Sequence, residues 1–355
     1  MKYHLSDAHL HFCDHARLAE LRSFQKQLAV ERIALVSLPV PERINFNPEL
    51  LYAKARLSGR PYILLSFDYT EHFFPRGGES LDLGGQVRAL HELGCDGIKI
   101  FAGKPDFQKR LGLELDGPVF AAAFRAAAGL ELPLLIHVAD PPQFFPDGAH
   151  PSYEELQGQA LRILKAHPDC VFIFPHLLML ANDLQRLSAL LDAYGNLCLD
   201  LAPGRYFYAE LGRRPEAACS FFRRFAGRIL FGSDGFWFPP GGCMFPPADL
   251  EENLRRARLL EDFLSGDGSF ANPFPPTREA VPRVRGLKLE RQVLELILKR
   301  NFIRLFGKRP RTLKRAACLA YLRDFRQRLK RIGPEAVHSG GPAVTAAAAA
   351  LKETA

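Results

Sequence analysis

Eight short runs of apolar and β-branched residues recur along the chain, each of a length that suits a buried strand. They lie near residues 3–8, 33–38, 62–67, 97–101, 133–138, 170–175, 197–201 and 229–233. Most are separated by segments with the 3.6-residue period of a helix, namely Gly85 to Leu93, Val119 to Ala128, Tyr153 to Ala166, Asp183 to Tyr194 and Pro215 to Phe225. The repeat of roughly 30 to 35 residues is typical of successive βαβ units.

Eight such units favour an α/β fold in which a parallel sheet closes into a (β/α)8 TIM barrel. Catalytic residues of that fold lie where strands end and the following loops begin. The pattern therefore directs attention to polar residues at the ends of the eight runs.

The carboxyl-terminal part of the chain extends beyond such a barrel. A helix is predicted over Leu287 to Phe306, after a Pro- and Gly-rich stretch from Ser265 to Gly286 that is long for a plain connection. Farther on, one helical face carries an apolar stripe and the other carries basic residues; the stripe is Leu322, Phe325, Leu329 and Ile332. This stripe would dock on the barrel wall.

We therefore divide the chain into a barrel over residues 1–310, a basic amphipathic helix over 311–332 and a tail over 333–355. The low-complexity tail contains an alanine run and has little to bury, so we expect it to be disordered.

Composition agrees with one large domain and a charged appendage. The 355 residues are 47% hydrophobic and 24% charged, enough apolar surface for a sizeable core. Between Lys299 and Arg331 there are 13 lysines and arginines and one acid, Asp324, whereas the whole chain carries only +8. The body of the protein is therefore mildly acidic, and the basic balance belongs to the appendage.

Cysteine usage and hydropathy indicate a soluble cytoplasmic protein. The seven cysteines form no Cys-x-x-Cys pair, and several fall in strand-like runs, so we expect free thiols. No apolar run approaches the roughly 18 residues that span a membrane, and the amino terminus does not resemble a leader peptide.

The strongest chemical signal is the run Asp7-Ala8-His9-Leu10-His11-Phe12. Histidines at i and i+2 of a strand project from one face, so both imidazoles can reach one metal ion. Three further polar residues close later apolar runs: His137, His176 and Asp234. Nitrogen and carboxylate ligands of this kind suit zinc or a similar divalent metal.

These motifs, in this order, resemble those of metal-dependent hydrolases of the amidohydrolase superfamily. The resemblance covers roughly residues 1 to 307 and lies in the branch similar to aminocarboxymuconate-semialdehyde decarboxylase, nearest its uncharacterised members. It includes Asp7-Ala8-His9-Leu10-His11, Gly97-Ile98-Lys99-Ile100, Gly103-Lys104-Pro105-Asp106, Leu135-Ile136-His137, His137-Val138-Ala139-Asp140-Pro141, Pro175-His176-Leu177, Asn196-Leu197-Cys198-Leu199-Asp200, Ile229-Leu230-Phe231-Gly232-Ser233-Asp234, and Asn301 with Arg304-Leu305-Phe306.

The resemblance implies a role for each polar residue. His9, His11 and His137 would be ligands of one divalent ion, with zinc expected and manganese or iron as alternatives. Asp234 would touch the metal and accept the proton of its water, which such an ion makes acidic near neutral pH. His176 would polarise a substrate carbonyl or hydrogen-bond the attacking water.

Each of these residues also has a purely structural interpretation. His9 and His11 suit solvent-facing positions on an edge strand, whereas His137 and His176 suit hydrogen-bonded interior positions. Asp234 suits a helix N-cap. Asp7 would orient an imidazole or make a structural hydrogen bond.

The substrate contacts are less specified by the pattern. Lys99 and Lys104 would attract a substrate carboxylate or form ordinary ion pairs. Related binuclear enzymes carbamylate a lysine on the fourth strand to bridge two metals, but the branch that this chain resembles generally works with one metal, so the resemblance disfavours that role for Lys99. Four loop residues would contact substrate or simply pack: Asp140, Arg205, Tyr206 and Trp237. Asp200 ends a strand and would reach the site or cap the following turn, and the cap is favoured.

The resemblance implies hydrolysis of a C–N or C–O bond in a small, carboxylate-bearing molecule, with non-oxidative decarboxylation as the alternative. A barrel that keeps metal without turnover is a third hypothesis, which the intact ligand set disfavours. Binding of nucleic acid or an anionic membrane by residues 299–331 is disfavoured because the aromatic residues there form the buried stripe. The sequence leaves open whether barrels form a homo-oligomer.

Overall fold

The computed structural model describes residues 4–57, 61–76, 80–146, 148–239, 248–271 and 283–353, without the side chains of Arg205 and Tyr206. All eight predicted strands are present in one parallel sheet, which confirms the predicted fold class. The strands are β1 (Leu5–Phe12), β2 (Val30–Val36), β5 (Tyr62–Ser66), β6 (Gly97–Gly103), β7 (Leu134–Val138), β8 (Phe172–Phe174), β9 (Leu197–Asp200) and the eighth as two pieces, β10 (Ile229–Leu230) and β11 (Gly235–Trp237).

The division of the eighth strand closes the barrel. β10 pairs with β9, and β11 pairs with β1, so the two pieces join opposite edges of the sheet. Two further backbone bonds complete the seam: the Ala8 amide donates to Phe231 O at 2.9 Å, and the Asp234 amide donates to His9 O at 3.0 Å. The loop between β10 and β11 therefore lies against the strand that carries His9 and His11.

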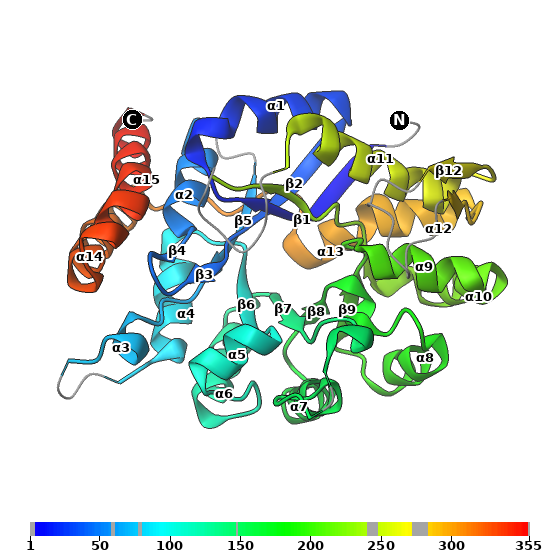
Figure 1. Ribbon diagram of the computed structural model, residues 1–355. Helices are drawn as coiled ribbons and strands as arrows, with labels where there is room; N and C mark the ends of the chain where they lie inside the picture. The colour runs from blue at the N-terminus through cyan, green and yellow to red at the C-terminus, as the bar shows by residue number, and fades with distance from the viewer. Residues whose placement is uncertain are drawn as a thin grey trace.

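Helices surround the sheet and connect successive strands (Figure 1). Five match the predicted helices within two residues at either end: α4 (Leu83–Leu93), α6 (Pro118–Gly129), α7 (Tyr153–Ala166), α8 (Leu184–Ala193) and α10 (Pro215–Phe225). The others of the barrel are α1 (Leu18–Gln27), α2 (Asn47–Arg56), α3 (Thr70–Phe73), α5 (Pro105–Leu111), α9 (Arg205–Arg213) and α11 (Leu250–Ser265).

Local sequence signals account for where several helices begin and end. Ser152 and Glu155 form a capping box at the start of α7, and the Asp82 side chain caps α4. Gly94 ends α4 with a φ of 92°, a left-handed conformation that glycine adopts without steric cost.

The last helix of the barrel begins four residues later than predicted and contains a π-helical turn. It consists of α12 (Arg291–Glu295), the π turn η5 (Leu296–Arg300) and α13 (Asn301–Phe306). Phe302 and Phe306 belong to the apolar cluster that fills the barrel with residues such as Ala8, Leu64 and Leu135. This helix therefore seals one end of the barrel and leaves the other for the polar residues.

Two short antiparallel ladders accompany the barrel: β3 (Pro39–Val40) with β4 (Ile44–Asn45), and β12 (Ser269–Ala271) with β13 (Arg283–Arg285). The second ladder belongs to the long Pro- and Gly-rich stretch, of which residues 272–282 lie outside the described part. The six described cysteines are free thiols, as predicted, and Cys243 lies outside that part. No helix among the described residues is long and apolar enough to cross a membrane.

The predicted basic amphipathic helix is α14 (Arg315–Ile332), which docks on the barrel through its apolar stripe. The buried residues are Cys318, Leu322, Phe325 and Leu329. Part of the positive charge is neutralised within the molecule: Arg328 pairs with Asp68 and Glu71 at 2.9 and 2.7 Å, and Lys314 pairs with Glu92 at 2.5 Å. This internal pairing accounts for part of the basic segment without an external anionic partner.

The expectation of a disordered tail over 333–355 is wrong. Pro334–Glu353 form a helix, α15, that packs against α14 and α2, as Figure 1 shows at the red end of the chain. Small residues allow this close packing: Ala343 and Ala347 are buried, and a Cβ on Gly340 would lie 2.9 Å from Leu329. Alanine also has the highest helix propensity, so the same composition that suggested disorder favours a helix once a partner is available.

A buried ion pair lies where the extension meets the barrel. Lys54 Nζ of α2 lies 2.6 Å from Asp96 Oδ2, just before β6, and donates to Gly94 O at 3.1 Å. Both side chains are buried, and Asp96 Oδ1 accepts the backbone amide of Arg311 at 2.6 Å. Helix α2, strand β6 and the extension therefore share one carboxylate.

We expect Lys54→Met to destabilise the protein by about 3 kcal/mol, because it leaves the buried Asp96 carboxylate without its cation. Urea unfolding followed by circular dichroism measures the change. Lys299→Met is the matched control: it removes the exposed pair with Glu31, 2.8 Å apart, and should cost less than about 1 kcal/mol. Equal losses in the two variants would contradict this role for Lys54.

Candidate metal centre

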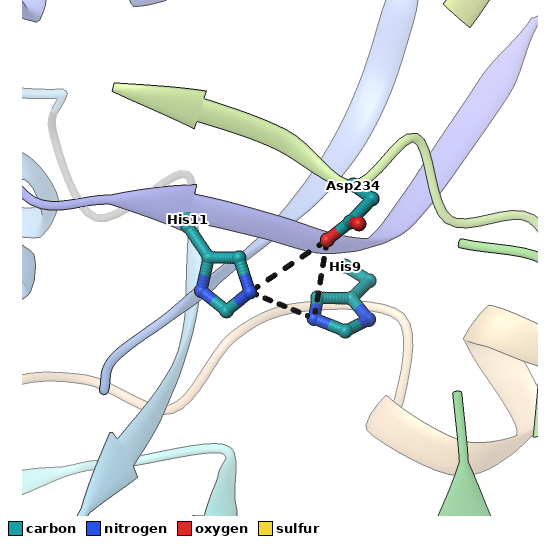
Figure 2. Close-up of side chains that lie close together, drawn as sticks. All are labelled: His9, His11 and Asp234. Atoms are coloured by element: carbon teal, nitrogen blue, oxygen red, sulfur yellow. Dashed lines mark hydrogen bonds and ion pairs between the residues drawn. The ribbon is translucent and has the colours of Figure 1, made fainter. Parts of the chain in front are cut away.

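His9, His11 and Asp234 form a compact cluster at the open end of the barrel (Figure 2). One potential ligand atom from each lies within 4.8 Å of the other two. His9 Nε2 is 3.1 Å from His11 Nε2, and these nitrogens are 3.8 and 3.7 Å from Asp234 Oδ1. Residues from the first and eighth strands thus converge as the sequence predicted.

Backbone geometry at both strands explains this convergence. The register of β1 against β2 shifts between Asp7 and Leu10, so Ala8 packs inside the barrel while His9 and His11 line the pocket above it. Asp234 lies in the break of the eighth strand with a φ of 51°, a conformation in which its side chain faces the histidines. Aspartate tolerates this left-handed region better than most residues.

Asp7 fixes the backbone around the cluster. Its Oδ1 accepts the amide of His9 and the amide of Ser233, both at 3.1 Å. Of the two predicted roles for Asp7, the structural hydrogen bond is the one that these contacts provide. The carboxylate that bonds an imidazole is a different one.

That carboxylate is Asp200, at the end of β9. Its Oδ2 lies 2.8 Å from His9 Nδ1, while Oδ1 accepts the amides of Ala202 at 2.9 Å and His176 at 3.3 Å. Asp200 therefore does both things that the sequence left open: it caps the following turn and it reaches the site. No local motif signals the contact with His9, which joins residues 191 positions apart.

These contacts determine which ring nitrogen faces the cluster. His9 Nδ1 donates to the Asp200 carboxylate, and His11 Nδ1 donates to Val36 O at 3.2 Å. With the ring proton on Nδ1, each Nε2 presents a lone pair toward Asp234. Hydrogen bonds of this kind typically orient imidazoles that bind metals.

His137 and His176 lie beside the cluster and not within it. The two rings have centroids 5.2 Å apart, and the His176 ring is 6.0 Å from that of His9. His137 Nε2 is buried and has no hydrogen-bond partner among the described residues; Asp140 Oδ1 is 3.9 Å away, beyond hydrogen-bond reach. A buried nitrogen left without a partner is costly, and a metal ion would satisfy it.

The electrostatics of the cluster also suit a cation. Burial lowers the pKa values of His9 and His11 well below the usual range and those of His137 and His176 to about 4, so all four rings are neutral at pH 7. Burial, with Asp200 nearby, raises the pKa of Asp234 to about 7. A divalent ion binds neutral imidazoles, and it would stabilise the ionised form of Asp234, which burial disfavours.

His176 stands at the start of an unusual turn. After β8, four successive residues that are not glycine, His176 to Met179, have φ between 52° and 56°. A left-handed conformation costs roughly 1–2 kcal/mol per residue, so surrounding contacts must hold this turn in place. One such contact is that of His176 Nδ1 with Ala202 O at 2.6 Å.

The four rings and Asp234 line a pocket of about 410 Å³. Five phenylalanines contribute to its walls: Phe101, Phe144, Phe207, Phe236 and Phe238. Lys99 and Lys104 also line it, as does Asp140. The cavity is of the size and composition that small-molecule sites favour.

The two lysines differ in their surroundings. Lys104 pairs with Asp140 across the pocket wall. Lys99 is only 1% exposed, and its ammonium has neither a hydrogen bond nor an ion pair among the described residues. Burial lowers the pKa of Lys99 to about 8, although Asp200 and Asp234 oppose this shift.

Three predicted substrate contacts need comment. Trp237 is fully buried against Phe24 of α1 and does not line the pocket, because its neighbours Phe236 and Phe238 take the inward positions of the strand. The prediction that Trp237 contacts substrate is therefore corrected: the residues on either side of it, Phe236 and Phe238, line the pocket instead. The side chains of Arg205 and Tyr206 lie outside the described part.

Arg256 was missed by the sequence argument although it lines the pocket. It comes from α11, where its guanidinium lies over the Phe236 ring at 4.9 Å and donates to Glu252 at 3.0 Å. The sequence around it is that of an ordinary charged helix, so only the packing of α11 beside β11 places it here.

A family model described as amidohydrolase matches residues 86–308. The chain belongs to the amidohydrolase family. The match spans more than half of the chain and includes His137, His176 and Asp234, whereas His9 and His11 precede it. The structure brings that histidine pair to Asp234, so the cluster joins a residue inside the match to a segment outside it. No curated protein matches this chain.

Solved structures share the fold of this amidohydrolase at low identity. A probable 2-pyrone-4,6-dicarboxylic acid hydrolase from Acinetobacter baumannii has 14% identity and a TM-score of 0.50, covering 86% of this chain and 100% of its own. A 2,6-dihydroxybenzoate decarboxylase has 15% identity and a TM-score of 0.50, over 85% and 98%. A TIM-barrel protein from Bordetella bronchiseptica has 13% identity and a TM-score of 0.50, over 80% of each chain.

We expect Asp200→Asn to weaken zinc binding by about 10- to 100-fold, because an amide is a weaker acceptor for the His9 Nδ1 proton and no longer fixes the tautomer. Competition with a chromophoric chelator measures the affinity. Asp192→Asn, at an exposed carboxylate paired with Arg224, is the matched control and should bind zinc as the wild type does. Unchanged affinity in Asp200→Asn would show that this contact does not support the site.

Proposed function

We propose that this amidohydrolase is a metal-dependent hydrolase that cleaves a C–N or C–O bond in a small, carboxylate-bearing molecule. The observation that carries the proposal is the pair of Nε2 lone pairs of His9 and His11 that face Asp234 at 3.8 and 3.7 Å in a small-molecule pocket. Fixed imidazole nitrogens and a carboxylate in a pocket have the donor chemistry of a catalytic metal site.

We assign one divalent ion to His9, His11, His137 and Asp234. The partnerless Nε2 of His137 supports its inclusion with the other three. Three neutral imidazoles and one carboxylate favour zinc, with manganese or iron as alternatives. When bound, such an ion acts as a Lewis acid and makes water nucleophilic at neutral pH.

The side chains of Asp234 and His176 would act on the attacking water. The Asp234 carboxylate would accept the proton of the attacking water, because it lies 3.8 and 3.7 Å from the His9 and His11 nitrogens that would hold the ion. His176 carries its proton on Nδ1, which faces Ala202 O, and so offers Nε2 as an acceptor. This tautomer favours a hydrogen bond from water over polarisation of a substrate carbonyl.

Lys99 is our candidate for the group that holds the substrate carboxylate. A buried ammonium without a partner is costly, and an arriving anion would offset that cost. Lys104 is less suitable because Asp140 already neutralises it. An anionic substrate would therefore bind with its charge deep in the pocket, beside the imidazoles.

Non-oxidative decarboxylation is the second candidate. The observation that favours it is the aromatic lining of the pocket, since a carboxylate removed from water into apolar surroundings loses carbon dioxide more readily. One of the solved structures with this fold is a decarboxylase bound to an aromatic acid. We also propose a cytoplasmic location, which the six described free thiols support.

We expect the purified protein to contain close to one divalent ion per chain and the double variant His9→Ala/His11→Ala to lose both metal and activity. Asp234→Asn should keep part of the metal yet lose about 10²- to 10⁴-fold in turnover, because its amide cannot accept a proton. Elemental analysis measures the metal. Lactones, amides and aromatic or muconate-type acids, scored for acid or carbon dioxide release, test the reaction. Full activity in either variant would refute the assignment.

We expect Lys99→Met to weaken binding of benzoate, used as a simple anionic probe, by at least about tenfold, which corresponds to about 1.4 kcal/mol. Isothermal titration calorimetry on the zinc-loaded protein measures this. Lys104→Met should weaken binding less, because its charge is already paired with Asp140. A larger effect at Lys104 than at Lys99 would reverse the assignment.

A further inference from the structure

The turn that carries His176 needs support from outside itself. Leu177 and Leu178 are fully buried and Met179 is nearly so, so water does not reach this strained segment freely. Within the turn, the amide of Leu178 bonds Pro175 O and that of Leu180 bonds Leu177 O, both at 3.0 Å. These two bonds leave the carbonyl oxygens of Leu178 and Met179 to other donors, and a buried carbonyl oxygen requires a hydrogen-bond donor.

Helix α7 supplies both donors. Gln157 Nε2 donates to Leu178 O at 2.9 Å, and the Tyr153 hydroxyl donates to Met179 O at 3.0 Å. The two side chains are four residues apart on α7 and so lie on one face of that helix. Helix α7, which packs on the outside of the barrel sheet, thus donates hydrogen bonds to two successive carbonyl oxygens of the strained turn.

Gln157 is specialised for this contact. It is fully buried, and its Oε1 has no hydrogen-bond partner among the described residues. A buried amide that uses only its donor side is costly for packing alone, where an apolar side chain of similar shape would serve better. The hydrogen bond to Leu178 O is what the polar group contributes.

We propose that Gln157 and Tyr153 are positioning residues that hold the left-handed turn and thereby fix the orientation of the His176 imidazole. Without them the turn relaxes toward ordinary backbone angles, and His176 leaves the contact between its Nδ1 and Ala202 O. Nε2 then no longer points reliably into the pocket. The catalytic consequence rests on the proposed function, whereas the orientation itself does not.

The test compares Gln157→Met with Gln159→Met in the protein with its measured metal content. Gln159 is also buried on α7, but it bonds Gln108 and the Leu115 amide, away from the turn. Nitrogen NMR of ¹⁵N-histidine-labelled protein reports the tautomer of each ring, and the His176 signals are those lost in His176→Gln. We expect the His176 ring to be protonated at Nδ1 alone in the wild type and in Gln159→Met, and to average between its two neutral tautomers in Gln157→Met.

Tyr153→Phe removes only the hydroxyl oxygen, and it is the second test variant if Gln157→Met fails to fold. It should accelerate amide hydrogen exchange at Leu178 and Leu180 by about tenfold relative to Gln159→Met. Wild-type His176 signals and exchange rates in both Gln157→Met and Tyr153→Phe would overturn the proposal.

If a substrate is identified, Gln157→Met should lower kcat by about tenfold with little change in KM. An altered His176 ring in a protein that turns over no substrate would separate the two proposals, because the positioning would stand while the function failed.

Discussion

The site depends on the way the barrel closes. Because the eighth strand is broken, one piece pairs with β9 and the other with β1, and the break itself bonds the first strand through the Asp234 amide and His9 O. Residues 225 positions apart thereby share one end of the barrel with no flexible connection between them. Asp7 reinforces the seam by accepting amides from both sides, those of His9 and Ser233. The geometry of the cluster is thus a property of the seam that closes the sheet, including the short break that carries Asp234.

A second set of contacts, made by the Nδ1 atoms, fixes the tautomer and the orientation of the imidazole rings. Asp200 and Val36 O take the Nδ1 protons of His9 and His11, and Ala202 O takes that of His176. Each ring therefore turns its lone pair inward, and burial keeps all of them neutral. Burying so many unprotonated nitrogens together is unfavourable without a cation, which is the physical basis for regarding the cluster as a metal site.

Sequence patterns predicted the parts of this structure that depend on local periodicity. The eight strands and the i, i+2 histidine pair follow from alternation along single segments, as do the capped helices such as α7. The contact between Asp200 and His9, the inward turn of Phe236 in place of Trp237, and the arrival of Arg256 depend on how distant segments pack. Helix α15 was missed for a related reason: its alanines resemble a disordered tail until α2 and α14 provide a surface to pack on.

The pocket itself bears on the choice between hydrolysis and decarboxylation. Decarboxylation requires charge to leave the carboxylate for carbon, so a cation that pairs with that carboxylate stabilises the ground state and slows the reaction. If Lys99 holds the substrate carboxylate, that group is protected and the reacting bond lies elsewhere, which favours hydrolysis. Loss of carbon dioxide requires a carboxylate that faces the aromatic wall, such as Phe101 or Phe238, away from Lys99. If Lys99 holds the carboxylate of a substrate that has only one, hydrolysis is therefore the better-supported reaction.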